Sequence, residues 1–395
     1  MQRTYVPWED NQFVTIDITD IQKQEPFFIQ EGWKEMEHPA VIACKNSIAN
    51  VENADEWDLR KKIMNSYEAV FSGDDGSFPS LVRVQPLSRS YFKMIEMLEH
   101  SEFWKDFKAL KALKALKALE QTSSQPFISA HICEGPGGFV QATIEHLVRH
   151  KIPVKGVYAM TLKPTKSNIP GWRRSTHFLK KYPQVRLEYG ADDTGDILKP
   201  KNQAWFSQRA EGAHLFTADG GFDFSVDYTN QEKMAFPLLL SSFTIGLNTL
   251  KKGGTMIIKL FDIYGSATQD LILGSALLFD SFTIYKPATS RPCNSERYFI
   301  GKGYYGKDDA NATQMIAHFQ QAQVKHAQSP LTQLFKNPWP EPVQRLMKEQ
   351  ISWQESLQIN SIQETLRMKN ELPEIYEHIL TNICQSKAWC KRFGF

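Results

Sequence analysis

The chain has 395 residues, of which 42% are hydrophobic, 12% aromatic and 23% charged, as is typical of a globular protein with a sizeable core. Its net charge is only +2, which excludes a uniformly basic surface, so any site for nucleic acid has to be a local patch. An apolar run of about 18 residues and an apolar N-terminal signal core are both missing, which argues against a membrane segment.

The cysteines indicate a cellular compartment. There are five of them, without the regular spacing of a disulfide framework or of paired zinc ligands. We therefore expect free thiols in a reducing intracellular compartment, either the cytoplasm or the nucleus.

The first 80 residues form an N-terminal extension to which we assign no chemistry. Residues 14–21 alternate apolar and polar side chains, which predicts a strand, and residues 55–70 have helical apolar spacing. Residues 88–98 are expected to form a helix with one apolar face and a serine cap. Lys93 lies one turn into this helix, where a solvated surface lysine is the ordinary interpretation.

Four copies of Lys-Ala-Leu occupy residues 108–119. All three residue types favour helix, but a period of three lags the helix by about 60° per repeat, so the leucines cannot form one core seam. The simpler interpretation, which we prefer, is a low-complexity surface helix. The alternative is that its four lysines grip a phosphate backbone.

From residue 127 onward, apolar β-prone runs alternate with helical patterns. We expect strands at 127–133, 154–160, 185–189, 214–219, 254–260, 281–285 and 296–302, and helices at 138–150, 171–181, 229–250 and 265–279. Such alternation predicts a mostly parallel sheet with helices on both faces. The last two strands have no helix between them, which predicts an antiparallel hairpin at the end of the sheet. The expected fold class is therefore α/β, a Rossmann-like sheet that is mostly parallel with an antiparallel last strand.

Residues 307–395 form a polar, helical C-terminal extension. Within it, a proline-rich break at 337–342 precedes two expected helices, 344–368 and 372–389. These helices either cap the sheet or bind a protein partner, and the sequence leaves both possibilities open.

The stretch 131–139, His-Ile-Cys-Glu-Gly-Pro-Gly-Gly-Phe, lies between the first expected strand of the sheet and the helix that follows it. Its glycines let a ligand approach the backbone, and the helix N-terminus offers free N–H groups to a carboxylate or phosphate. Glu134 would repel a pyrophosphate, so a ligand with an amine or sulfonium suits this loop better. The alternative is a purely structural turn, because a G-P-G-G run alone is a weak motif.

Three further charged residues stand at the ends of, or inside, expected strands. Asp219 ends an apolar strand at the edge where open α/β sheets bind ligands, although Asp-Gly is also an ordinary turn. Lys259 lies inside an apolar strand, so it either extends to solvent or has a partner. Glu296 begins the last strand, where a solvated strand end is the ordinary interpretation.

Lys93, Asp219, Lys259 and Glu296 occur in the order of the Lys-Asp-Lys-Glu tetrad of FtsJ-like RNA 2′-O-ribose methyltransferases, and residues 85–305 resemble that family. The segments that carry the resemblance are SRSYFKMIEML, HICEGPGGF, YGADDTGDIL, ADGGFDF, GGTMIIKLFD and KPATSRPCNSERYFIGKGY. The antiparallel end of the sheet also suits a methyltransferase. Gly135 replaces the more usual alanine, and the Lys-Ala-Leu insert separates the first lysine from the glycine loop. The extensions 1–80 and 307–395 lie outside the resemblance.

The resemblance implies S-adenosylmethionine as cofactor, a catalytic tetrad of Lys93, Asp219, Lys259 and Glu296, and no metal ion. The cofactor would be bound by Cys133, Glu134, Gly135, Pro136, Gly137, Gly138, Phe139, Asp192, Asp193, Asp196 and Asp219. The glycines would pass its amino-acid end, so a Cβ at Gly137 is expected to fill the space of the ligand. The three aspartates at 192–196 would face its adenine or ribose.

The resemblance also implies the nucleophile, a ribose 2′-OH, which is weak at neutral pH and needs a base or a positive environment. Lys259 suits the role of base if burial and the charge of Lys93 lower its pKa. Asp219 and Glu296 would fix the ammonium groups and oppose that drop. The balance between these effects has to come from the structure.

The expected substrate is RNA. TSRPCNSERY and ADGGFDF most resemble the cap-specific mRNA branch, so we expect methylation at a cap-proximal nucleotide. Trp172, Tyr228 and Tyr264 are possible stacking partners for a methylated guanine, although core packing is the commoner fate of such residues. Methylation of ribosomal or transfer RNA, and an inactive RNA-binding scaffold on the same fold, remain alternatives. A dinucleotide oxidoreductase is disfavoured by the glycine spacing.

Overall fold

The computed structural model describes residues 26–29, 38–48, 51, 53–73, 78–103, 126–165, 171–221, 230–368 and 371–395. The expected strand at 14–21, the Lys-Ala-Leu segment at 108–119 and Tyr228 lie outside these residues.

The centre of the fold is a seven-stranded sheet with the order β4-β3-β2-β5-β6-β8-β7. Its strands are β2 (Phe127–Ile132), β3 (Val154–Met160), β4 (Val185–Glu188), β5 (Ala213–Ala218), β6 (Leu250–Leu260), β7 (Phe279–Tyr285) and β8 (Arg297–Tyr304). All neighbours are parallel except β8, which runs antiparallel to both β6 and β7. The α/β sheet with an antiparallel last strand is thereby confirmed.

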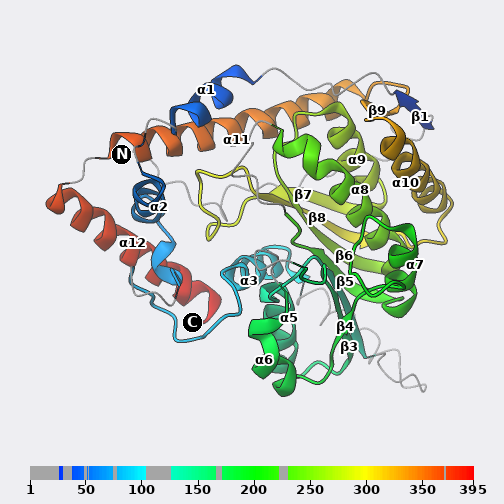
Figure 1. Cartoon of the computed structure of the whole chain (residues 1–395), viewed down its shortest axis with the longest axis horizontal. Coiled ribbons are helices and arrows are strands. Elements are labelled where there is room, and N and C mark those ends of the chain that lie inside the picture. The colour runs from blue at the N-terminus through cyan, green and yellow to red at the C-terminus, as the bar shows by residue number, and fades with distance from the viewer. Residues whose placement is uncertain are drawn as a thin grey trace.

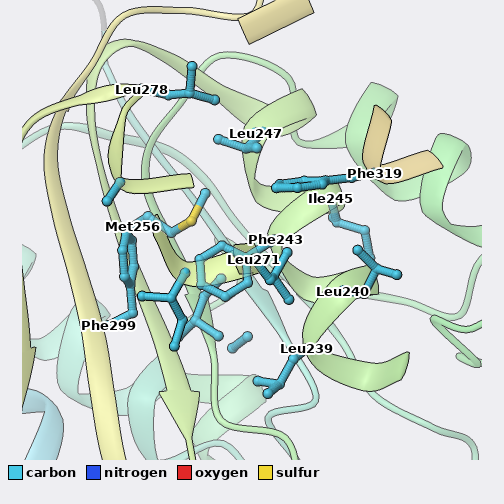
Figure 2. Close-up of a cluster of buried hydrophobic side chains, with 14 of the residues drawn as sticks. Leu239, Leu240, Phe243, Ile245, Leu247, Met256, Leu271, Leu278, Phe299 and Phe319 are labelled. Carbon is cyan, nitrogen blue, oxygen red and sulfur yellow. The ribbon is translucent and has the colours of Figure 1, made fainter. Parts of the chain in front are cut away.

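Helices cover both faces of the sheet (Figure 1). One face carries α3 (Ser90–His100), α5 (Gly138–Arg149) and α6 (Thr176–Lys181), and the other carries α7 (Pro200–Arg209), α8 (Gln231–Thr249), α9 (Ser266–Ala276) and α10 (Ala310–Gln328). Figure 2 shows the packing on the second face, where Phe243 of α8 and Leu271 of α9 meet Met256 and Phe299 of the sheet. Each such buried side chain contributes about 1.5–3 kcal/mol relative to an exposed one.

Two expectations differ from the structure. The helix predicted over 55–70 ends early: α2 spans Ala54–Ile63, and a separate 3-10 turn, η3, spans Glu68–Val70. Asn65 explains the break, because its side-chain oxygen accepts from the Tyr67 N–H while its amide donates to Glu68, which competes with helical bonding. Helix α7 was not predicted at all, although Pro200 at its first turn is a recognised start signal.

The flanking extensions pack onto the sheet domain. Strand β1 (Pro26–Ile29) pairs with β9 (Gln333–Phe335), and α1 (Pro39–Ser47) lies along the long helix α11 (Glu341–Arg367). Helix α12 (Leu372–Phe393) lies against η3 and α3. The predicted helices 344–368 and 372–389 are confirmed with small shifts of their ends. Among the described residues, no helix is both long and apolar enough to cross a membrane.

The strand order reverses direction between β2 and β5, the point at which open α/β sheets bind ligands beyond the carboxyl ends of their strands. The register places His131 beside Thr217 and Ile132 beside Ala218. The residues that follow these strands, Cys133 and Asp219, therefore emerge side by side.

Candidate functional site

The four tetrad residues meet beyond this edge of the sheet. Lys93 Nζ lies 2.6 Å from Glu296 Oε1, and Lys259 Nζ lies 3.2 Å from Glu296 Oε2. Lys259 Nζ also lies 3.5 Å from Asp219 Oδ1. Glu296 therefore bridges the two ammonium groups, and Lys259 bridges the two carboxylates. All four side chains are at most 16% exposed, so solvent screens their interactions only weakly.

Each residue reaches the site from a different element. Lys93 projects from the first turns of α3, and Asp219 directly follows β5. Lys259 lies in β6, opposite Tyr298 of β8, and Glu296 is the residue just before β8. Lys259 and Glu296 are 37 positions apart in the sequence (259 to 296), and the antiparallel pairing of β6 with β8 brings them together.

The carboxylates decide the charge state of the site. Burial by itself lowers the pKa of the Lys259 ammonium, but Asp219 and Glu296 outweigh it and the pKa is raised above its ordinary value. Burial by itself raises the pKa of Glu296, but Lys93 and Lys259 outweigh it and the pKa lies well below its ordinary value. The condition of a lowered lysine pKa is thus not met, and Lys259 is an ammonium in the free protein.

Two hydroxyl groups complete the site, and sequence reasoning missed both. Tyr298 donates to Asp219 Oδ1 at 2.9 Å, and burial followed by the charge of Asp219 raises its pKa, so it remains a donor. Ser290 donates to Glu296 Oε1 at 2.7 Å. The alternation of side chains along a strand could have indicated Tyr298, because residues 296 and 298 of an extended chain point to the same side.

The glycine loop begins with a buried carboxyl group. Thr217 donates to Glu134 Oε1 at 2.6 Å, while Oε2 is buried without a hydrogen-bond partner in the part of the chain that the structure describes. Burial and then the nearby Asp219 raise the pKa of Glu134 well above its ordinary value. A cationic ligand at this position would supply the missing partner and restore the ionised form. The N-terminus of α5 follows at once, with Gly137 as its cap at φ +112°.

A side chain at Gly137 would meet neighbouring protein, which the sequence did not predict. A Cβ there would lie 2.9 Å from the Trp172 ring and 3.2 Å from Leu87. Gly138 is equally constrained, because a Cβ would overlap the hydroxyls of Ser88 and Ser90. These glycines therefore allow α3 and the segment around Trp172 to pack tightly on the loop.

The aspartates at 192–196 form a turn stabilised from within. The carboxylate of Asp192 accepts from Thr194, Asn202 and Lys199, and the first of these bonds is the largest cause of its lowered pKa. Asp193 is exposed, at φ +60°, and pairs with Lys163 at 2.5 Å. Asp196 accepts from the Leu198 N–H. Asp193 is therefore the most accessible of the three carboxylates.

The remaining predicted loop residues lie where the sequence placed them. Cys133 has φ +57°, and burial raises the pKa of its thiol to about 12, so it is not a nucleophile at neutral pH. Gly135 and Pro136 are joined by a cis peptide bond, and Phe139 is fully buried.

Two of the aromatic residues considered for cap stacking, Trp172 and Tyr264, are described, and both are buried. Trp172 is 7% exposed and lies over Gly137. Tyr264 is 3% exposed, and the ring of His38 stacks on it at a centroid distance of 3.8 Å. Neither the Trp172 ring nor the Tyr264 ring is therefore open for a guanine base to stack on.

A cluster of ligand-type side chains lies elsewhere. Glu99 of α3, His146 of α5 and His150 directly after α5 have ligand atoms within 4.8 Å of one another. They lie at the opposite end of α5 from the glycine loop, so this cluster is separate from the tetrad.

The part of the chain that contains this site matches a known protein family. The model of the FtsJ-like methyltransferase family matches residues 86–304, which is more than half of the chain. The chain belongs to the FtsJ-like methyltransferase family. This membership implies S-adenosylmethionine as the methyl donor.

Its curated relatives carry a more specific name, cap-specific mRNA (nucleoside-2′-O-)-methyltransferase 1. The relative from Trypanosoma cruzi is 35% identical over 193 residues, which cover 47% of this chain and 51% of that protein. The human relative is 35% identical over 188 residues, which cover 46% of this chain and 22% of that protein. The matched part thus spans about half of the first relative and less of the human one.

Among solved structures, a ribosomal RNA methyltransferase from Plasmodium falciparum aligns with a TM-score of 0.35 at 18% identity, covering 56% of this chain and 99% of that chain. At that TM-score the likeness says nothing about function.

Proposed function

We propose that this protein transfers a methyl group from S-adenosylmethionine to a ribose 2′-OH of RNA, at a cap-proximal nucleotide. The observation that carries the proposal is the buried Lys93–Glu296–Lys259–Asp219 chain of ion pairs beside the glycine loop. Its two ammonium groups suit an oxygen nucleophile that gains negative charge. Asp219 at one end of the chain emerges beside Cys133, at the start of a loop suited to a cationic ligand.

Lys259 is assigned the role of stabilising the attacking oxygen. As an ammonium it donates a hydrogen bond to the 2′-oxygen and favours the negative charge that grows there. Asp219 and Glu296 hold the ammonium in place, and Lys93 adds a second positive charge through Glu296. The hydroxyl proton leaves to water as the new carbon–oxygen bond forms.

The glycine loop is assigned to the cofactor, which supplies a methyl group already activated on a positively charged sulfur. Glu134 and the N-terminal N–H groups of α5 suit the ammonium and the carboxylate of its amino-acid end. Asp193, and with it the turn at 192–196, is assigned to the adenosine end. Alignment of nucleophile and methyl group supplies much of the remaining rate.

The substrate assignment is supported by the names of the relatives, which specify capped mRNA, and by the segments TSRPCNSERY and ADGGFDF. The test compares methyl transfer to short RNAs that differ only in the presence of a 5′ cap, followed by nuclease mapping of the product. We expect transfer only to capped RNA and only at the first or second nucleotide.

The same experiment tests the assigned roles with Lys259→Ala. This variant should lose at least about 100-fold in turnover, as for loss of a preorganised charge donor, while S-adenosylhomocysteine still binds in calorimetry. Lys307→Ala is the matched control, because that lysine pairs with exposed Glu211 and should leave turnover unchanged. Transfer to uncapped RNA or at internal positions would indicate the ribosomal or transfer RNA branch. Cofactor binding without transfer to any RNA would indicate a scaffold.

Three coarser assignments complete the proposal. We assign methyl transfer to residues 85–305 and a supporting role to the extensions. A reducing intracellular compartment is supported by all five cysteines being free thiols. A protein partner through the C-terminal helices is supported by Leu372, Tyr376 and Leu380, which are at least 61% exposed and follow one another at helical spacing on α12.

A further inference from the structure

Residues 286–296, which we call the glutamate loop, connect β7 to β8 and end in Glu296. In Figure 1 this loop is yellow and projects from the sheet toward α11 and α3. Much of its anchoring comes from two buried carboxylates that belong to neither strand, Glu96 and Glu68.

Glu96 is fully buried on α3, three residues after Lys93. It accepts hydrogen bonds from the backbone N–H groups of Ala288 and Thr289 in the glutamate loop. It also accepts from Tyr285 at 2.7 Å and from the Trp389 indole at 3.0 Å. One carboxylate thus joins the Lys93 helix, the glutamate loop and the C-terminal helix α12.

Glu68 is fully buried in η3, within the N-terminal extension. Arg291 of the glutamate loop binds it through two nitrogens at 2.8 and 3.1 Å, and Arg89 binds it at 2.9 Å. Arg89 is the residue directly before α3, and it also donates to the Thr289 carbonyl. Glu68 therefore connects the start of the Lys93 helix to the glutamate loop.

Helix α11 adds a third attachment. Gln358 donates to the Cys293 carbonyl at 3.1 Å, and the Cys293 thiol contacts the hydroxyls of Ser361 and Thr365. The groups that reach the glutamate loop directly from η3 and α11, and indirectly from α12, all lie outside residues 86–304.

We propose that Glu68 and Glu96, with Trp389 behind Glu96, are positioning residues that hold Glu296 against Lys93 and Lys259, so that both extensions set the turnover of the site. This proposal rests on the proposed methyl transfer. Its physical basis is that a satisfied buried carboxylate network is stiff, and that losing one donor leaves a buried charge under-satisfied. A loop loosened in this way would spend less time with Glu296 between the two ammonium groups.

The test uses Trp389→Phe and Glu68→Gln in the full chain. The first removes one indole N–H and keeps a ring in the aromatic cluster, and the second removes the charge that Arg89 and Arg291 share. Trp205→Phe is the matched control, because it removes an indole bond to Glu188 on the far side of the sheet. Each protein is examined by amide hydrogen exchange, calorimetry with S-adenosylhomocysteine, and kinetics on capped RNA.

We expect the amides of 286–296 to exchange about tenfold faster in both variants, as for loss of one hydrogen bond to a charged group. We expect kcat to fall about tenfold, with KM for RNA and the affinity for S-adenosylhomocysteine within about twofold, and no change in the control. Unchanged exchange in the loop, or equal loosening in Trp205→Phe, would overturn the proposal. Failure of the wild-type protein to methylate RNA would instead overturn the proposed function, while hydrogen exchange still tests the positioning.

Discussion

At the scale of residues, Tyr298 shows how the site depends on neutral donors as well as on charges. It is fully buried, and its hydroxyl donates to Asp219, the carboxylate that also pairs with Lys259. If Asp219 lost this bond, its carboxylate would be free to rotate away from Lys259. Tyr298 is therefore a second support for the ammonium that faces the nucleophile.

Tyr298→Phe should lower turnover about tenfold, which corresponds to about 1.4 kcal/mol for one hydrogen bond to a charged group. Single-turnover methyl transfer at saturating cofactor measures it. Tyr304→Phe is the control on the same strand, because it also removes a buried hydroxyl bond, here to the Leu247 carbonyl, away from the tetrad. Equal rates for the two variants would mean that Tyr298 only packs.

The structure brings together the four charged residues that the family resemblance indicated, but the sequence did not predict their charge balance. Their types and order could be matched to a family motif, whereas the sign of a lysine pKa shift depends on distances. In the structure Asp219 and Glu296 lie 3.5 and 3.2 Å from Lys259, and this proximity outweighs burial. Gly137 is a second example. The sequence indicated that another group approaches the backbone closely there, and the structure shows that the Trp172 ring does so.

At the scale of elements, Glu232 links the start of α8 to the start of α9. Its carboxylate accepts from the N–H groups of Tyr264 and Gly265, which directly precede α9. Burial outweighs these bonds and raises the pKa of Glu232 to about 8. The folded protein therefore binds a proton at Glu232 under conditions in which the unfolded chain, with an ordinary pKa near 4.3, has lost it.

This difference makes the contribution of Glu232 to stability fall as pH rises from about 4 to about 8. Between about pH 5.5 and pH 8 the wild-type protein should lose about 3 kcal/mol of unfolding free energy relative to Glu232→Gln, which cannot titrate. Urea unfolding of both proteins at the two pH values measures the difference. A constant gap between them would show that Glu232 titrates normally in the fold.

The elements themselves were predicted unevenly. Sheet strands such as β5 and β6 were found because buried runs of apolar residues have few alternatives. The prediction of a continuous helix over 55–70 was wrong because the side chain of Asn65 hydrogen-bonds the backbone locally. The spacing of apolar residues carries no signal for such a bond. Helix α7 was missed because its apolar face is short and its polar residues dominate the pattern.

At the scale of the whole molecule, the hydrophobic core extends beyond the residues that match the family. The match ends at residue 304, but Trp389 and Phe393 of α12 belong to the same buried cluster as α3 and α5. Trp389 lies 293 positions from its partner Glu96 in sequence. No local pattern could predict such a contact, so the sequence left open whether the C-terminal helices cap the sheet or bind a partner, whereas in the fold α12 packs against η3 and α3.

Trp389→Ala should therefore lower the free energy of unfolding by about 3–5 kcal/mol, the cost of a cavity where a fully buried tryptophan was. Leu380→Ala on the same helix is the matched control and should stay within about 0.5 kcal/mol, because that side chain is 61% exposed. Urea denaturation followed by circular dichroism measures both. If α12 were an independent appendage, Trp389→Ala would melt that helix alone and leave the main transition unchanged. A single shifted transition is expected instead, because the indole contacts Phe92 of α3 and Phe395 at the end of the chain, inside the core that supports Lys93.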